Sequence, residues 1–116
     1  MEGTLGQMMK AVLVKELPLQ NLGLPSIWWK NVPLFNFTDS LFFLDFCMEH
    51  GISVIGVEGF RFIGENRIPD MDCIVDFSEL PESPPLSFCE RSIIAAKKFM
   101  SYMPQHDVFF EVVLAK

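Results

Sequence analysis

The sequence predicts a single α+β domain, residues 1–116, in which two helices pack on an antiparallel sheet. Two β-type runs separated by a turn composition predict a central hairpin over about residues 52–77. Stretches with good capping residues predict helices near 39–50 and 87–103. The β-branched and aromatic segment DVFFEVVLAK predicts a C-terminal strand. Half of the 116 residues are hydrophobic, which is enough for one packed core.

The first third of the chain has two segments with different patterns. LGQMMKAVLVKEL, around residues 6–17, has Met9, Val12 and Leu13 at helical spacing, which favours a helix. The run AVLV within it also fits a strand, so both remain open. LGLPSIWWKNVPLF, residues 22–35, has two prolines and two adjacent tryptophans, and it predicts an ordered loop that packs on the domain.

Capping residues predict where both helices begin. Thr38 can cap the first helix, which places Asp39 at the positive end of its dipole, and Gly51 suits a left-handed stop. Ser87 and Glu90 fit the S-x-x-E capping box of the second helix. The predicted buried stripe of this helix consists of Cys89, Ile93, Ala96, Met100 and Met103.

The hairpin strands ISVIGVEGFRFI and RIPDMDCIVDF are joined by Gly64-Glu65-Asn66. A turn tip at Glu65 and Asn66 sets Ile63 opposite Ile68 and Arg61 opposite Asp70, and alternation then divides the hairpin into two faces. The predicted core face carries Val54, Glu58, Phe60, Phe62, Met71, Cys73, Val75 and Phe77. The other face carries Ile55, Val57, Gly59, Arg61, Ile63, Ile68, Asp70, Asp72, Ile74 and Asp76.

This division separates the acids of the hairpin. Asp70, Asp72 and Asp76 share a face with aliphatic side chains, a mixture typical of a contact surface. Glu58 falls on the apolar face, where it must lie at the rim of the sheet, accept hydrogen bonds or have a raised pKa.

The acidity of the chain is concentrated in its middle. Residues 39–82 carry ten acids and two arginines, a net charge of −8, whereas the whole chain carries −6. Such a surface repels phosphate backbones, so nucleic acid is not an expected partner. It either attracts a basic protein or serves solubility alone.

The sequence contains no recognisable catalytic motif, so we do not expect an enzyme. Carboxylates two residues apart on a strand lie roughly 6–7 Å apart and diverge, which disfavours a metal site. His50 and His106 have no partners at ligand spacing, and the three cysteines lack any C-x-x-C pair, so they are interpreted as reduced core thiols. No Gly-rich phosphate loop is present, and no cofactor is expected.

The expected location is the cytoplasm. The N-terminal stretch MEGTLGQMMK lacks the basic-then-apolar plan of a signal peptide. No apolar run approaches the roughly 18 residues that cross a bilayer, so no membrane association is expected.

A protein-binding module fits these features best. The predicted contact residues are Glu58, Asp70, Asp72 and Asp76, with Trp28 and Trp29 as candidate aromatic anchors. The alternative for either tryptophan is a mainly structural role in the core.

The run GISVIGVEGFRFIGENRIPDMDCIVDFSEL, within residues 38–80, resembles bacterial immunity proteins of the polymorphic-toxin and contact-dependent growth inhibition type. The resemblance implies a small acidic cytosolic protein that binds the toxic C-terminal domain of a cognate effector, often a basic nuclease, and blocks it without chemistry. A metal-dependent hydrolase using Glu58 and the aspartates, or a regulatory or adaptor subunit with a non-toxin partner, remain alternatives. The oligomeric state is open.

Overall fold

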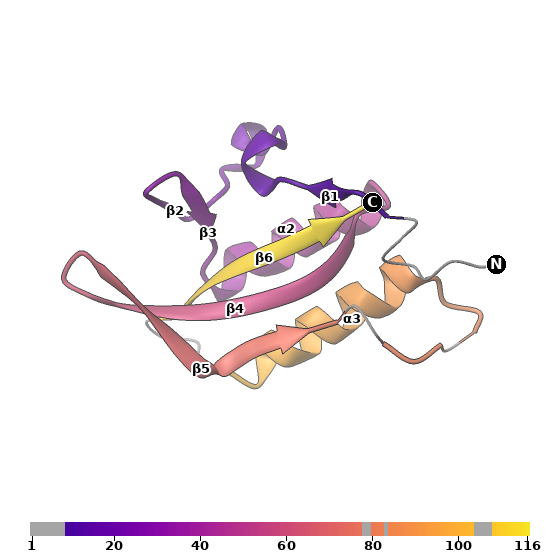
Figure 1. The fold of residues 1–116 in the computed structure, drawn as a ribbon. Helices are drawn as coiled ribbons and strands as arrows, with labels where there is room; N and C mark the ends of the chain where they lie inside the picture. The colour runs from indigo at the N-terminus through magenta and orange to yellow at the C-terminus, as the bar shows by residue number, and fades with distance from the viewer. Residues whose placement is uncertain (1–8, 78–79, 83, 104–107) are drawn as a thin grey trace.

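Two helices cover one face of a four-stranded antiparallel sheet (Figure 1). The computed structural model describes residues 9–77, 80–82, 84–103 and 108–116, and it describes residues 69–74 by their backbone alone. The sheet has the strand order β1-β6-β4-β5, and β2 and β3 form a separate hairpin. In chain order the elements are β1 (Ala11–Val12), η1 (Val14–Glu16), η2 (Gln20–Leu22), β2 (Ile27–Trp29), β3 (Val32–Leu34), α2 (Phe37–Glu49), β4 (Ser53–Ile63), β5 (Asn66–Asp76), α3 (Phe88–Ser101) and β6 (Phe109–Ala115).

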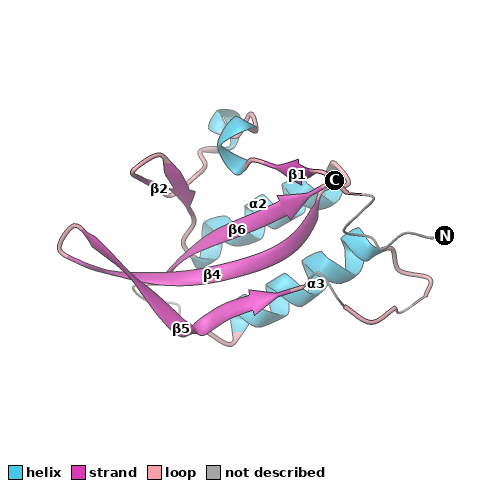
Figure 2. Cartoon of the chain, viewed as in Figure 1, coloured by secondary structure: helices cyan, strands magenta, loops and turns pink. Residues whose placement is uncertain are grey.

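The predicted α+β class is confirmed. The predicted central hairpin is β4–β5, and the predicted C-terminal strand is β6, which lies between β1 and β4. Both predicted helices form, and Figure 2 shows them on the same side of the sheet. In the described part of the chain, no helix covers the opposite face of the sheet.

The helix caps are only partly as predicted. Asn36 caps α2, because its side chain accepts a hydrogen bond from the Asp39 amide at 2.8 Å. The prediction of Thr38 as the cap is therefore wrong, because the helix begins two residues earlier and Thr38 lies within its first turn. The helix ends as predicted before Gly51, which has a φ of +65°. The Ser87 capping box of α3 is confirmed.

The core fills the space between the helices and the sheet. Phe43 of α2 is fully buried and stacks on Phe35, with the ring centroids 4.4 Å apart. The predicted stripe of α3 is confirmed: Ile93, Ala96 and Met100 are buried, and Cys89 and Met103 pack against them. From the sheet, the buried partners are Val54, Val57, Phe110, Val112 and Leu114.

Of the two possibilities left open around residues 6–17, the strand and not the helix forms in the described part of that segment. The chain forms β1, because Lys10 and Lys116 exchange backbone hydrogen bonds of 2.8 Å, and it then turns into the short η1. The predicted loop over 22–35 contains the β2–β3 hairpin. Its two turn residues, Lys30 and Asn31, have φ values of +47° and +68°, which suit a type I′ turn.

The register of the β4–β5 hairpin differs from the prediction by two residues. Ile63 lies opposite Asn66, and Arg61 lies opposite Ile68 instead of Asp70. The loop is the pair Gly64-Glu65, and Gly64 has a φ of +61° at the first loop position, where a type II′ turn needs glycine. The predicted tip at Glu65 and Asn66 was therefore wrong, because it placed Gly64 outside the two-residue loop.

One irregularity exchanges the predicted faces of β4 beyond Val54. Its pairing with β6 shifts between Val54 and Gly56, so Ile55 is an extra residue in β4. The shift between Glu58 and Gly59 lies in β5, where Ile74 and Asp70 are the successive partners, and it leaves the faces of β4 unchanged. An extra residue in a strand reverses which side the following side chains face. Val57 therefore lies in the core with Val112, although the prediction placed it on the outer face. Glu58, with Phe60 and Phe62, lies on the side away from the helices.

Candidate partner-binding face

The face of the sheet away from α2 and α3 mixes carboxylates with aliphatic side chains. We call it the open face, formed by Ile55, Gly56, Glu58, Asp76, Glu111 and Val113. In β6, Phe110, Val112 and Leu114 point into the core, so the alternate residues Glu111 and Val113 point outward. Val113 is 49% exposed although it lies in a central strand, which shows that nothing among the described residues covers it.

Glu58 lies directly opposite Glu111 on the neighbouring strand. Like charges in this arrangement repel each other across the strands. The Arg67 guanidinium relieves the repulsion on one side, because its Nη1 lies 3.0 Å from Oε1 of Glu111. Within the described part of the chain, the half-buried Glu58 carboxylate has neither a hydrogen bond nor an ion pair. The open face therefore has a carboxylate that a cation from outside can reach.

Arg67 also joins the tip of the β4–β5 hairpin to the β2–β3 hairpin. Its guanidinium carbon lies 4.4 Å from the centroid of the Trp29 ring and 3.9 Å from that of Phe60. Trp29 Nε1 donates a hydrogen bond to the backbone oxygen of Glu65 at 3.1 Å. Trp29 is thus engaged within the molecule, whereas Trp28 is 56% exposed.

The structure places the predicted contact residues unequally. Glu58 lies on the open face, and exposed Asp76 lies opposite Gly56 at its edge. The backbone of Asp70 lies opposite Gly59, but the side chains of Asp70 and Asp72 lie outside what the structure describes. The candidate surface is therefore built from β4, β5 and β6 together.

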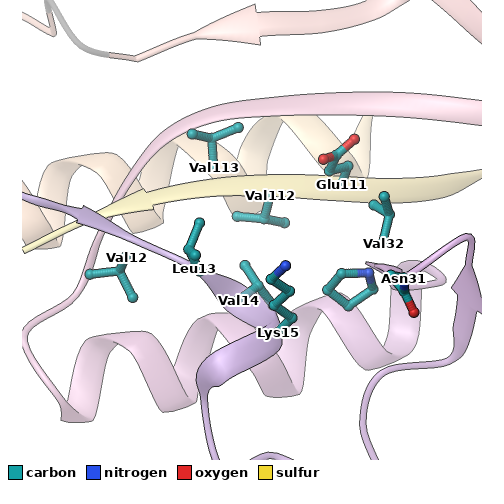
Figure 3. A pocket seen from close by; sticks show the side chains of 10 residues that line it. Val12, Leu13, Val14, Lys15, Asn31, Val32, Glu111, Val112 and Val113 are labelled. Carbon is teal, nitrogen blue, oxygen red and sulfur yellow. The ribbon is translucent and has the colours of Figure 1, made fainter.

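Two hollows lie on either side of Val113. A groove of about 260 Å³ runs between η1 and β3 (Figure 3), and its walls include Leu13, Val32 and Pro33. A second hollow of about 310 Å³ is lined by Val113 with Ile55, Gly56, Val75 and Asp76. The exposed aliphatic surface is continuous with recesses that a partner side chain can fill.

Sequence reasoning missed Glu111, Arg67 and Val113. The acid Glu111 in the middle of the apolar run VFFEVVLA already indicated that one side of this strand faces water. The pairing of Arg67 with Glu111 joins residues 44 positions apart, and no local pattern predicts it.

Other candidate groups contribute little chemistry. Within the described ranges, no three His, Cys, Asp or Glu side chains come together as a metal site. His50 lies at the end of α2, where its Nδ1 is 2.9 Å from the Phe46 oxygen and its ring stacks on Phe46. His106 lies outside the described residues. No helix in the described part of the chain has the length and apolar character of a membrane span.

Comparisons with protein-family models, with curated proteins and with solved structures find no match to this chain. The class of protein is therefore inferred from the surface that the fold presents.

We expect the replacement Arg67→Ala to lower the free energy of unfolding by about 1–2 kcal/mol, because it removes two stacking contacts and the ion pair together. The matched control is Lys30→Ala, since Lys30 lies 4.8 Å from the Trp29 centroid but stacks on one ring only. The control should cost less than about 0.5 kcal/mol in urea unfolding. Equal losses would show that Arg67 does not hold the two hairpins together.

Cys47 should be inert in the folded protein. Burial, and secondarily the neighbouring Cys89, raises the pKa of the Cys47 thiol from 9.0 to about 12. Between about pH 9 and pH 12 the folded state keeps this proton, whereas the unfolded state loses it. The free energy of unfolding should therefore fall as the pH rises through this range. Iodoacetamide labelling at pH 8, located by peptide mass spectrometry, should modify Cys47 only at the rate of unfolding. Faster labelling than unfolding would contradict this environment.

Proposed function

We propose that this chain is an immunity protein that binds the toxic C-terminal domain of a cognate bacterial effector and neutralises it by protein–protein contact. The observation that carries the proposal is the open face, on which Glu58, Glu111 and Asp76 surround exposed Val113. Interfaces commonly combine an apolar centre with a charged rim that selects the partner.

The charge of the chain supports a basic target. A net charge of −6 attracts a cationic domain such as a nuclease and accelerates its association. An acidic inhibitor on such a domain would also exclude its nucleic-acid substrate, because both compete for the same positive surface. Inhibition then requires no catalytic group in this chain.

Growth rescue tests the proposal. The toxin domain encoded beside the gene of this chain should arrest growth when expressed alone, and co-expression of this chain should restore it. The purified proteins should form a complex with nanomolar affinity. Full toxicity in the presence of the folded chain, or failure of the two proteins to bind, would refute the immunity function.

The purified chain also distinguishes an immunity protein from the alternative function, a metal-dependent hydrolase. A site that binds Mg²⁺, Mn²⁺ or Ca²⁺ in the folded state must raise the melting temperature when the ion is added. A concentration-dependent rise, lost in a Glu58→Gln variant, would favour the hydrolase over the immunity protein.

Replacement of Asp70, Asp72 and Asp76 by Asn should slow association with the toxin domain and weaken its dependence on salt. A control with the same charge change replaces three acids away from β5: Glu16, Glu49 and Glu82, each by Gln. Stopped-flow association rates at several ionic strengths provide the comparison. Unchanged rates at low salt in the aspartate variant would exclude a steering role for these residues.

A further inference from the structure

The edge of β6 that faces away from β4 forms backbone hydrogen bonds near its two ends, and this ladder of hydrogen bonds is interrupted between them. Lys116 exchanges two backbone hydrogen bonds with Lys10, both of 2.8 Å, and Phe110 exchanges two with Phe35, of 2.7 and 3.0 Å. Alternate residues of a strand direct their N–H and C=O groups to the same edge. Val112 lies two residues from Phe110, so its N–H and C=O point to this edge as well.

Neither flanking segment supplies a partner for Val112. On one side β1 ends at Val12, and the chain turns into η1, where the Val14 oxygen accepts the Leu17 amide at 3.0 Å. On the other side the next ladder position belongs to Pro33, which has no N–H to donate to the Val112 oxygen. The Pro33 oxygen is not a ladder partner of the Val112 N–H either, because the pairing on this side stops at Phe35 and Phe110. Among the residues that the structure describes, no backbone hydrogen bond joins Val112 to either segment. A donor and an acceptor therefore face the gap between β1 and β3.

This gap is the groove of Figure 3. Its walls are the apolar side chains of Val12, Leu13, Val14, Val32 and Pro33, and Lys15 and Asn31 also line it. Its volume of about 260 Å³ lies below the range of about 300–1,000 Å³ that holds cofactors and drug-sized ligands. The groove suits one aliphatic side chain together with the backbone that carries it.

We propose that the groove anchors the toxin domain by one aliphatic residue on an extended stretch of its backbone. The N–H and C=O of that residue pair with those of Val112, which is strand addition limited to one residue because β1 and β3 occupy the rest of the edge. Its side chain packs between Leu13 and Val32, and basic residues beside it face Glu111 and Glu58. This inference rests on the proposed immunity function, and the charge of the open face supports a partner that is basic around the anchor.

The free protein gives the first test. In amide hydrogen exchange followed by NMR, the Val112 amide should exchange at least about tenfold faster than the Phe110 amide, which is hydrogen-bonded at the same edge. Equal protection of the two amides in the free chain would mean that the edge is already closed, and it would overturn the proposal.

The complex gives the second test. Addition of the toxin domain should slow exchange at Val112 to the rate of Phe110. Leu13→Trp, which fills the groove, should weaken binding by about tenfold or more, mainly through faster dissociation. Ile94→Trp is the control, because both wild-type side chains are 50% exposed but Ile94 lies on α3, away from the groove. The control should bind as the wild type does.

The outcomes separate this inference from the function on which it rests. Absence of any complex between the wild-type chain and the toxin domain would overturn both. A tight, neutralising complex in which Leu13→Trp binds normally and Val112 stays unprotected would overturn the groove alone. Self-association of the free chain that Leu13→Trp abolishes would assign the groove to a second copy and also overturn the proposal.

Discussion

Replacement of Phe43 by alanine should lower the free energy of unfolding by about 3–5 kcal/mol. Phe43 is fully buried, its ring stacks on Phe35 at 4.4 Å, and it belongs to the face of α2 that packs on the sheet. Removal of the ring loses its burial and leaves a cavity that the close-packed core cannot fill. Most small domains have only about 5–15 kcal/mol of stability, so the variant should be close to unfolding.

The neighbouring residue provides the control. Phe42 has the same side chain on the same helix, but it is 61% exposed. The replacement Phe42→Ala should change stability by less than about 0.5–1 kcal/mol in urea unfolding. Similar losses at both positions would contradict the orientation of α2.

Reversal of charge on the open face should have the largest effect on binding. The double replacement Glu58→Lys with Asp76→Lys places two cations where a basic partner docks, and like charges across an interface cost several kcal/mol. Affinity for the toxin domain should fall by about 100-fold or more, as measured by titration calorimetry. Neither replaced residue is a member of the Arg67–Glu111 ion pair.

The control for net charge is Glu49→Lys with Glu82→Lys. Both residues are exposed and neither belongs to the open face, so this variant changes the total charge equally. Its loss of affinity should be small and should disappear at high salt. Equal losses in the two double variants at high salt would show that overall charge, and no particular face, governs binding.

The sequence predicted the elements of this fold better than their pairing. Capping residues such as Ser87 and Glu90, together with apolar spacing, are local features, and they correctly predicted α3 and the approximate limits of α2. The β4–β5 register depended on which residues form the turn, and Gly64 was placed outside the predicted tip. A two-residue error in the turn moves every cross-strand pair.

The candidate site was predicted only in part, because its residues come from separate strands and are brought together only by the tertiary fold. Strict alternation placed Glu58 among core residues, whereas the shift between Val54 and Gly56 turns it to the open face. Alternation alone does not reveal such an irregularity. The partners that define the surface, Glu111 and Arg67, come from separate strands and meet only after folding.

A binding footprint tests the central claim most directly. Isotope-labelled chain is titrated with the toxin domain, and amide and methyl NMR shifts are recorded. Large changes are expected at Val113 and Glu58 on the open face and at Leu13 in the adjoining groove, and none at Phe42 and Ile94, which are exposed on the helices. A footprint on α2 and α3 with an unperturbed open face would contradict the claim.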